Sequence, residues 1–308
     1  MGAVEKQGII FVVLAYVLWG FMPIYWKLLE HVSSDEILSG RVIWSFIFTL
    51  MLVIVGRNVK QLKIDMMDLW ANQKSFWGLF VASYLVTGNW FTYIYAVNAG
   101  FIVQTSLGYY INPLLSILLG IVFLKERLSR AQQFAVLLAA IGVIILTVSY
   151  GEIPWIAFTL AITFALYGLI KKSIKIDALR GLTIETLFVL PVALIYFVYL
   201  VASDKAVFFT SDSPTVILLI FTGVATAVPL ILFAKGTKTM PLYMSGFFQY
   251  IAPTLMLLVG VLLYDEAFSK IEFLSFSCIW FALILFTVSK IVEVRKTGPK
   301  EARPTLDK

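Results

Sequence analysis

Long apolar runs separated by short polar gaps form the pattern of the whole chain. Ten runs are of membrane-crossing length, at residues 8–26, 37–55, 76–97, 102–124, 131–150, 154–170, 181–201, 215–234, 242–264 and 271–291. A helix needs roughly 20 apolar residues to cross a hydrocarbon core of about 30 Å. Because lipid offers no partner to a bare backbone, each run must be helical. The pattern predicts an all-α integral membrane protein with ten transmembrane helices.

One of these predicted helices occurs twice. Residues 110–129, YINPLLSILLGIVFLKERLS, match residues 250–269, YIAPTLMLLVGVLLYDEAFS, at eight of twenty positions without a gap. The match pairs the fourth predicted helix with the ninth, so each half contains five helices. Because five is odd, equivalent helices cross in opposite directions, which is an inverted repeat. Such folds bind substrate near the midplane between the halves.

The repeat divides the chain. We predict a first repeat at 8–150, a second repeat at 154–291 and a cytoplasmic tail at 292–308. A duplication kept only for helix packing is the alternative.

Composition agrees with a membrane protein and indicates its orientation. The chain is 60% apolar and 14% charged, with a mean hydropathy of +0.92, whereas soluble domains are about 45–50% apolar and about 25% charged. The basic residues lie in the gaps, where they are typical of membrane topology and not of nucleic-acid binding. Twenty Lys and Arg fall on the side of the termini and three on the other side, Lys27, Lys205 and Lys270. Both termini are therefore predicted to be cytoplasmic.

Few residues offer the chemistry of an enzyme. His31 is the only histidine and Cys278 the only cysteine. No histidine-based metal or acid–base site can be assembled from them, and the runs contain no nucleophile elbow or glycine-rich phosphate loop. The sequence predicts no enzyme activity, no catalytic residue, no cofactor, no metal and no nucleic-acid partner.

Several longer motifs resemble a known family. They are LWGFMPIYWK (18–27), DEILSGRVIWSF (35–46), GNWFTYIYAVN (88–98), SLGYYINPLLSILLGIVFLKERL (106–128), ALYGLIKK (165–172), IETLFVLPVALIYF (184–197) and GFFQYIAPTLM (246–256). The chain resembles the RarD branch of the EamA transporters, within the drug/metabolite transporter (DMT) superfamily. The resemblance implies a carrier in the bacterial inner membrane, with ten helices in two EamA repeats and a small-molecule substrate.

Arg41 lies about five residues inside the second run, near its predicted external end. Charges inside membrane helices are rare and usually face a cavity or a partner. Arg41 would then bind a carboxylate or phosphate of the solute with its planar guanidinium. The alternative is an arginine that extends toward the lipid headgroups.

Glu185 occupies the place in the seventh run that Arg41 occupies in the second, since the segment ILSGR, which ends at Arg41, corresponds to the segment GLTIE, which ends at Glu185. Inversion puts Glu185 near the cytoplasmic end, too far from Arg41 for an ion pair. A desolvated Glu could carry a coupling proton. The alternative is a structural Glu held by Thr183 or by the lysines of 171–175.

Pro113 and Pro253 lie in the middle of the duplicated run. Each removes a hydrogen bond to the carbonyl four residues earlier and can kink its helix. Polar and aromatic residues surround both prolines, namely Tyr109, Tyr110, Asn112, Gln249 and Tyr250. We predict that this set forms the substrate site; the alternative is that both prolines only shape helix packing.

Further predicted substrate-binding residues are Trp44, Asn89, Trp90 and Gln104, with Trp19 and Tyr25 as additional candidates. Trp26, Trp70, Trp77 and Trp155 are interpreted as interfacial anchors. Glu126 and Glu266 follow the two copies of the repeat and are interpreted as structural. Each is expected to bind the first-turn N–H groups of the following helix.

These features predict a secondary transporter that works by alternating access and exports a small amphipathic solute in exchange for protons. The aromatic and polar residues suit an amino-acid-like solute or a small drug, and the resemblance to the RarD branch implies a chloramphenicol-like one. The protein would be a monomer or a homodimer in the bilayer. A membrane sensor or assembly protein that binds a ligand without transporting it is the alternative.

Overall fold

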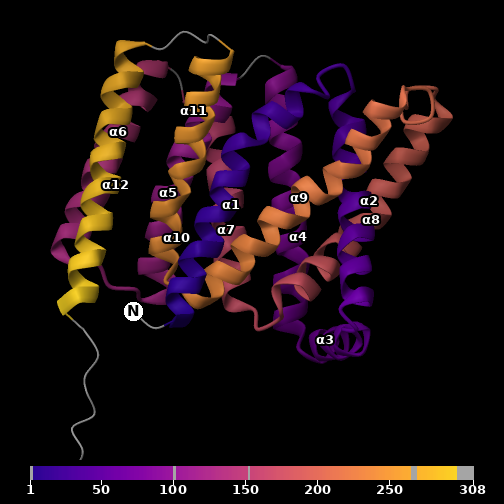
Figure 1. The fold of residues 1–308 in the computed structure, drawn as a ribbon, viewed down its shortest axis with the longest axis horizontal. Coiled ribbons are helices and arrows are strands. Elements are labelled where there is room, and N and C mark those ends of the chain that lie inside the picture. The colour runs from indigo at the N-terminus through magenta and orange to yellow at the C-terminus, as the bar shows by residue number, and fades with distance from the viewer. Residues whose placement is uncertain (1–2, 100–101, 152, 265–268, 297–308) are drawn as a thin grey trace, which may run out of the picture.

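The computed structural model describes residues 3–99, 102–151, 153–264 and 269–296. Within these ranges the chain forms α-helices and no strand (Figure 1). The helices are α1 (Ala3–Lys27), α2 (Ser34–Val55), α3 (Val59–Ala71), α4 (Gln73–Asn98), α5 (Ile102–Leu124), α6 (Arg130–Tyr150), α7 (Trp155–Ser173), α8 (Ala178–Ala202), α9 (Ser213–Thr239), α10 (Leu242–Gln249), α11 (Ile251–Leu263) and α12 (Lys270–Lys296).

The described helices confirm a multi-pass membrane protein. Nine segments among the described residues are long and apolar enough to cross a membrane, with α10 and α11 counted together. The tenth predicted run is α4, which carries hydroxyl residues in its middle. Ser83 and Thr87 satisfy their hydroxyl groups within the helix, by donating to the carbonyls of Leu79 (2.7 Å) and Ser83 (2.8 Å). Such internal bonds let a polar helix enter an apolar environment.

Helix packing confirms the inverted repeat. With five transmembrane helices a half, α1 corresponds to α7, α2 to α8, α4 to α9, α5 to α10–α11 and α6 to α12. The contacts follow this correspondence: α5 packs on α7 as α11 packs on α1, and α4 packs on α7 as α9 packs on α1. The pairs α2–α8, α6–α12 and α5–α10 each join a helix to its own equivalent. The α3 segment and the α8–α9 connection lie at opposite ends of the bundle (Figure 1).

The two halves meet with very little space between some backbones. A Cβ on Gly236 of α9 would lie 2.7 Å from the Gly8 carbonyl oxygen of α1, and one on Gly223 would lie 2.3 Å from the backbone of Trp44. Small residues of this kind are what membrane helices use for close approach, because lipid provides no hydrophobic drive between them. The buried aromatic residues Tyr16, Tyr167 and Phe233 fill the core between the halves.

The connection at 56–75 contains the helix α3, which the search for long apolar runs did not predict. Its buried residues are Leu62, Asp65 and Leu69. Figure 1 shows α3 at the end of the bundle where α1 begins and α12 ends. We call this end the basic side, because most Lys and Arg of the chain lie in its connections.

The two copies of the repeated helix differ in their continuity. Pro113 lies inside the unbroken helix α5, whereas the other copy is divided at Tyr250 into α10 and α11. The division lies three residues before Pro253, which has no N–H to donate to the Gln249 carbonyl. The single span predicted at 242–264 is therefore two helices in sequence.

Glu126 binds a helix, but not the one that was predicted. Its carboxylate accepts hydrogen bonds from the backbone N–H groups of Leu242 (2.7 Å) and Tyr243 (2.9 Å), in the first turn of α10. The following helix α6 is capped instead by Ser129, whose hydroxyl accepts from the N–H of Gln132. The reason is the turn after α5, which brings the Glu126 N–H to the Gly120 carbonyl (3.2 Å) and directs the chain back toward the other half. Glu266 lies outside the described residues.

Candidate functional site

A cavity of about 100 Å³ lies between the two halves. Its walls come from α1, α2, α4, α5, α7, α9, α10 and α11. Trp26 at the end of α1 and Arg41 near the start of α2 both line it. Since these helix ends lie away from the basic side, the cavity occupies the half of the bundle toward the opposite side.

Arg41 supplies the charge of the cavity. Its Nε donates to the Thr226 hydroxyl (3.0 Å), and its guanidinium carbon lies 4.7 Å from the ring centroid of Trp26 and 4.5 Å from that of Trp90. No ion pair joins Arg41 to a carboxylate among the described residues. Two aromatic faces and a hydroxyl stabilise a cation less completely than a carboxylate does. The site is therefore suited to an anionic group.

An aromatic wall adjoins this charge. Trp19, Trp90, Tyr93 and Tyr109 all line the cavity, and the rings of Tyr93 and Tyr109 lie 5.9 Å apart between centroids. Trp26 was interpreted as an interfacial anchor, and the structure places it in this wall instead. The reason is helical spacing: Trp19, Met22, Pro23 and Trp26 recur at i, i+3, i+4 and i+7 and all line the cavity.

Three buried polar side chains meet where α5 passes α10. The Ser116 hydroxyl lies 3.2 Å from the Asn112 amide oxygen and 3.5 Å from that of Gln249. Asn112 and Gln249 also line the cavity. Asn89 lines it as well, while its amide nitrogen donates to the Leu160 carbonyl (2.7 Å) and the Thr163 hydroxyl (2.9 Å). Asn89 thereby also ties α4 to α7.

Other predicted site residues lie away from this cavity. Tyr110 packs its ring edge-on against Phe276, with centroids 4.9 Å apart, and its hydroxyl donates to the Pro253 carbonyl (3.4 Å). Tyr250 is fully buried and its hydroxyl has no hydrogen-bond partner among the described residues. Trp44 lies against Phe208. Pro253 lines the cavity and Pro113 does not.

The backbone of Gln104 belongs to α5, but its side chain is outside the described set. Sequence reasoning missed Tyr93 and Thr226. Tyr93 follows Asn89 and Trp90 by four and three residues, so the helical period of α4 indicates it. Thr226 has no comparable signal, because its role depends on how α9 crosses α2.

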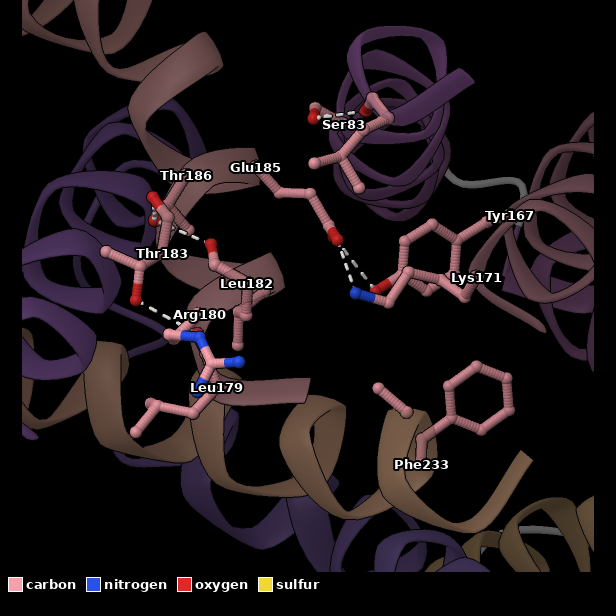
Figure 2. A network of polar contacts seen from close by, with 12 residues as sticks. Ser83, Tyr167, Lys171, Leu179, Arg180, Leu182, Thr183, Glu185, Thr186 and Phe233 are labelled. Atoms are coloured by element: carbon pink, nitrogen blue, oxygen red, sulfur yellow. Dashed lines mark hydrogen bonds and ion pairs between the residues drawn. The ribbon is translucent and has the colours of Figure 1, made fainter. Parts of the chain in front are cut away.

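Glu185 forms a separate buried network on the basic side of the cavity (Figure 2). Its carboxylate pairs with the Lys171 ammonium and accepts a hydrogen bond from the Tyr167 hydroxyl (3.2 Å). The Lys171 and Glu185 side chains are only 3% and 2% exposed. Glu185 and Arg41 thus have different partners in the structure, and Lys171 is the lysine that pairs with Glu185.

Aromatic rings separate this network from the cavity. Trp19 and Phe164 line the cavity with their rings 5.6 Å apart, and both contact Phe233, at 5.8 Å and 5.5 Å between centroids. Phe233 in turn stacks on Tyr167 at 6.2 Å. The ion pair and this aromatic layer lie between the cavity and the basic side. Among the described residues, no three His, Cys, Asp or Glu side chains gather as a metal site.

The chain is similar to known transporters over nearly its full length. The model of the EamA-like transporter family matches residues 6–148. The chain is 47% identical to "Uncharacterized transporter YojE" of Bacillus subtilis, covering 94% of this chain and 96% of that protein. It is 40% identical to "Protein RarD" of Escherichia coli (95% and 98%) and 29% identical to "Chloramphenicol-sensitive protein RarD" of Pseudomonas aeruginosa (92% and 94%).

A solved structure, titled "Crystal structure of protein", matches with a TM-score of 0.67 at 15% identity. The match covers 92% of this chain and 98% of that one. At this identity the match supports the fold alone. The long matches to RarD proteins and to YojE support more. The chain belongs to the EamA-like transporter family and is a RarD-type transporter of the DMT superfamily.

Proposed function

We propose that this membrane transporter moves a small amphipathic solute with an anionic group by alternating access, using the cavity around Arg41. The observation that carries this proposal is an arginine that lies between two tryptophan rings, lines a cavity and forms no ion pair with a described carboxylate. Arg41 would bind the carboxylate or phosphate of the solute, and Trp19, Tyr93 and Tyr109 would contact its apolar part. Asn112 and Gln249 would supply hydrogen bonds.

The size of the cavity supports a closed or nearly closed state. A volume of about 100 Å³ is below the roughly 300–1,000 Å³ of ligand pockets. A solute therefore needs movement of the two halves to enter, as alternating access requires. In this conformation the Glu185–Lys171 pair and the layer around Phe233 would form the closed gate on the basic side.

We infer further that the basic side faces the bacterial cytoplasm and that transport is export coupled to proton entry. The excess of Lys and Arg on the basic side supports the orientation. Glu185 supports the coupling: a proton on its carboxylate would remove the attraction to Lys171, and the gate would then open. Solute would enter from the cytoplasm as the proton leaves Glu185.

An amino-acid-like solute fits Arg41 best, because its carboxylate would form an ion pair with the Arg41 guanidinium. A neutral drug such as chloramphenicol would fill the aromatic wall but leave Arg41 unpaired. The name of the Pseudomonas aeruginosa relative makes that drug the second candidate.

The test uses the purified full chain in proteoliposomes, with N-acetylphenylalanine, its methyl ester and chloramphenicol as probes. We expect the acid to exchange in a counterflow assay, with unlabelled acid inhibiting uptake of labelled acid. The ester should do neither. Arg41→Ala should lower flux of the acid at least about thirtyfold, since the loss of a buried charge partner costs about 2–5 kcal/mol. Lys27→Ala, which removes an exposed cation paired with Glu30, is the control and should transport normally. Equal handling of acid and ester would refute the anion site.

Flux of chloramphenicol alone would favour the second candidate. Binding of a probe without flux would favour the alternative of a membrane sensor or assembly protein that binds a ligand but does not transport it. Proton coupling has its own test, in which Glu185→Gln combined with Lys171→Met, which leaves no buried charge unpaired, keeps counterflow but loses its response to an imposed pH gradient. An unchanged response would refute the role of Glu185.

A further inference from the structure

Helix α3 lies across the basic side, between the end of α2 and the start of α4 (Figure 1). With 13 residues it is too short to cross a bilayer. Leu62, Asp65 and Leu69 are its buried residues, at i, i+3 and i+7. This stripe packs on the bundle, and Asp65 pairs there with Arg180 in the first turn of α8. One face of α3 is thus fixed to the protein.

A second face of α3 is apolar and exposed. At 3.6 residues a turn, Val59, Met66, Met67 and Trp70 lie side by side next to the buried stripe. Met67 is 71% exposed and Trp70 is 70% exposed. A third face carries exposed Gln61 and Asp68. A short helix with a protein-facing, an apolar and a polar side has the pattern of a helix that lies in a membrane surface.

The cations of α3 lie on the apolar face, with Lys63 in the middle of the face and Lys60 at its border. Lys60 and Lys63 are exposed, and neither forms an ion pair among the described residues. Long basic side chains at such a border can leave their stems in the apolar layer and extend their ammonium groups to headgroups. Exposed Arg57 and Lys74 stand just before and after the helix. The charge of this surface is complementary to an anionic lipid leaflet.

We propose that α3 is an interfacial lipid-binding helix. Val59, Met66, Met67 and Trp70 insert among the acyl chains of the leaflet on the basic side, and Lys60 and Lys63 bind the phosphates of anionic phospholipids. Continuity also supports this partner, since α3 joins two helices that cross that leaflet. The Asp65–Arg180 pair holds the helix at the correct depth.

The insertion can be measured with single-cysteine variants, because Cys278 is the only native cysteine. In a Cys278→Ser background, Met67→Cys tests the apolar face, and its neighbour Asp68→Cys is the matched control on the polar face. Each is labelled with an environment-sensitive fluorophore and reconstituted in phosphatidylcholine with or without phosphatidylglycerol. We expect a lipid-borne nitroxide to quench position 67 at least about threefold more than position 68, and aqueous iodide to show the reverse. Equal quenching at the two positions would overturn the proposal.

The choice of anionic lipid is tested by charge removal. Quenching at position 67 should increase with phosphatidylglycerol, and Lys60→Gln with Lys63→Gln should abolish that increase. Lys205→Gln with Lys270→Gln removes the same charge on the opposite side of the bundle and should leave the increase intact. If both pairs behave alike, or if phosphatidylglycerol has no effect, the headgroup assignment is wrong.

Discussion

Arg41 and Glu185 occupy equivalent places in the two halves, seven residues after Ser34 at the start of α2 and seven after Ala178 at the start of α8. Their surroundings are opposite. Arg41 lines a cavity between two tryptophan rings and has no carboxylate partner among the described residues, whereas Glu185 is buried against Lys171 and Tyr167. The backbone repeat is symmetric, but its charges are not. The charge of the first half has no carboxylate partner among the described residues, and the charge of the second half is paired and buried.

The difference lies in the residues that α1 and α7 carry at equivalent places. Leu-Trp-Gly at 18–20 in α1 corresponds to Leu-Tyr-Gly at 166–168 in α7. Four residues beyond the aromatic position, α7 carries Lys171 and α1 carries Pro23, which lines the cavity. The same position therefore supplies a counter-ion to Glu185 in one half and carries no charge in the other half. Because unpaired charges in membranes are costly, Arg41 is the charge on which we base the proposed function.

The largest effect is expected from breaking the closed pair. Lys171→Met leaves the Glu185 carboxylate buried without a counter-ion, which should destabilise the protein by about 3–5 kcal/mol. Lys171→Met together with Glu185→Gln should recover most of that loss, since no lone charge remains. Unfolding in mixed micelles compares the three proteins; a double variant no more stable than the single one would contradict the pairing.

The next largest effect should come from giving Arg41, the unpaired charge of the first half, a counter-ion. Pro23→Glu places a carboxylate in the wall of the cavity that Arg41 also lines, and it should compete with an anionic solute, lowering flux at least about tenfold. Pro23→Gln has nearly the same shape without the charge and should remain close to wild type. Proteoliposome counterflow measures both. Equal flux in the two variants would show that Arg41 need not be free.

The two copies of the repeated helix provide a smaller contrast, between Gln249, which lines the cavity, and Tyr110, which does not. Gln249→Ala removes a hydrogen-bonding side chain from the cavity wall and should reduce flux about three- to tenfold, as expected for about 0.5–1.5 kcal/mol. Tyr110→Phe changes a residue of α5 that faces away from the cavity, so it should reduce flux less. The opposite order would place the solute outside the cavity described above.

The smallest effect concerns stability alone. Glu126→Gln removes the charge at the first turn of α10 but keeps an acceptor, so the free energy of unfolding should fall by about 0.3–1 kcal/mol. Gln132→Ala is the matched control, because it removes a helix-capping hydrogen bond of α6 that lies within one half. Greater loss of transport in Glu126→Gln than in Gln132→Ala, at equal stability, would indicate that the link between halves also serves movement.

Much of the candidate site was predictable from residue types. Arg41, Asn112 and Gln249 were selected because polar groups inside apolar runs need a partner, and the structure brings all three to one cavity. Tyr110 and Tyr250 were selected with them, yet each follows a cavity-lining residue by one position. Successive residues on a helix point about 100° apart. Only the packing of the helices decides which of two neighbours faces the cavity.

The sequence by itself determined the helical class, the ten crossings and the opposed halves, because lipid requires internally bonded helices and a five-helix repeat must invert. Only the tertiary structure decided that Glu126 binds a helix 116 residues further along, that Tyr250 divides α10 from α11, and that α3 rests on the basic side. Each of these depends on contacts between segments far apart in the chain. Hydropathy indicates which segments lie in the membrane, but it does not indicate which residues of other segments they contact.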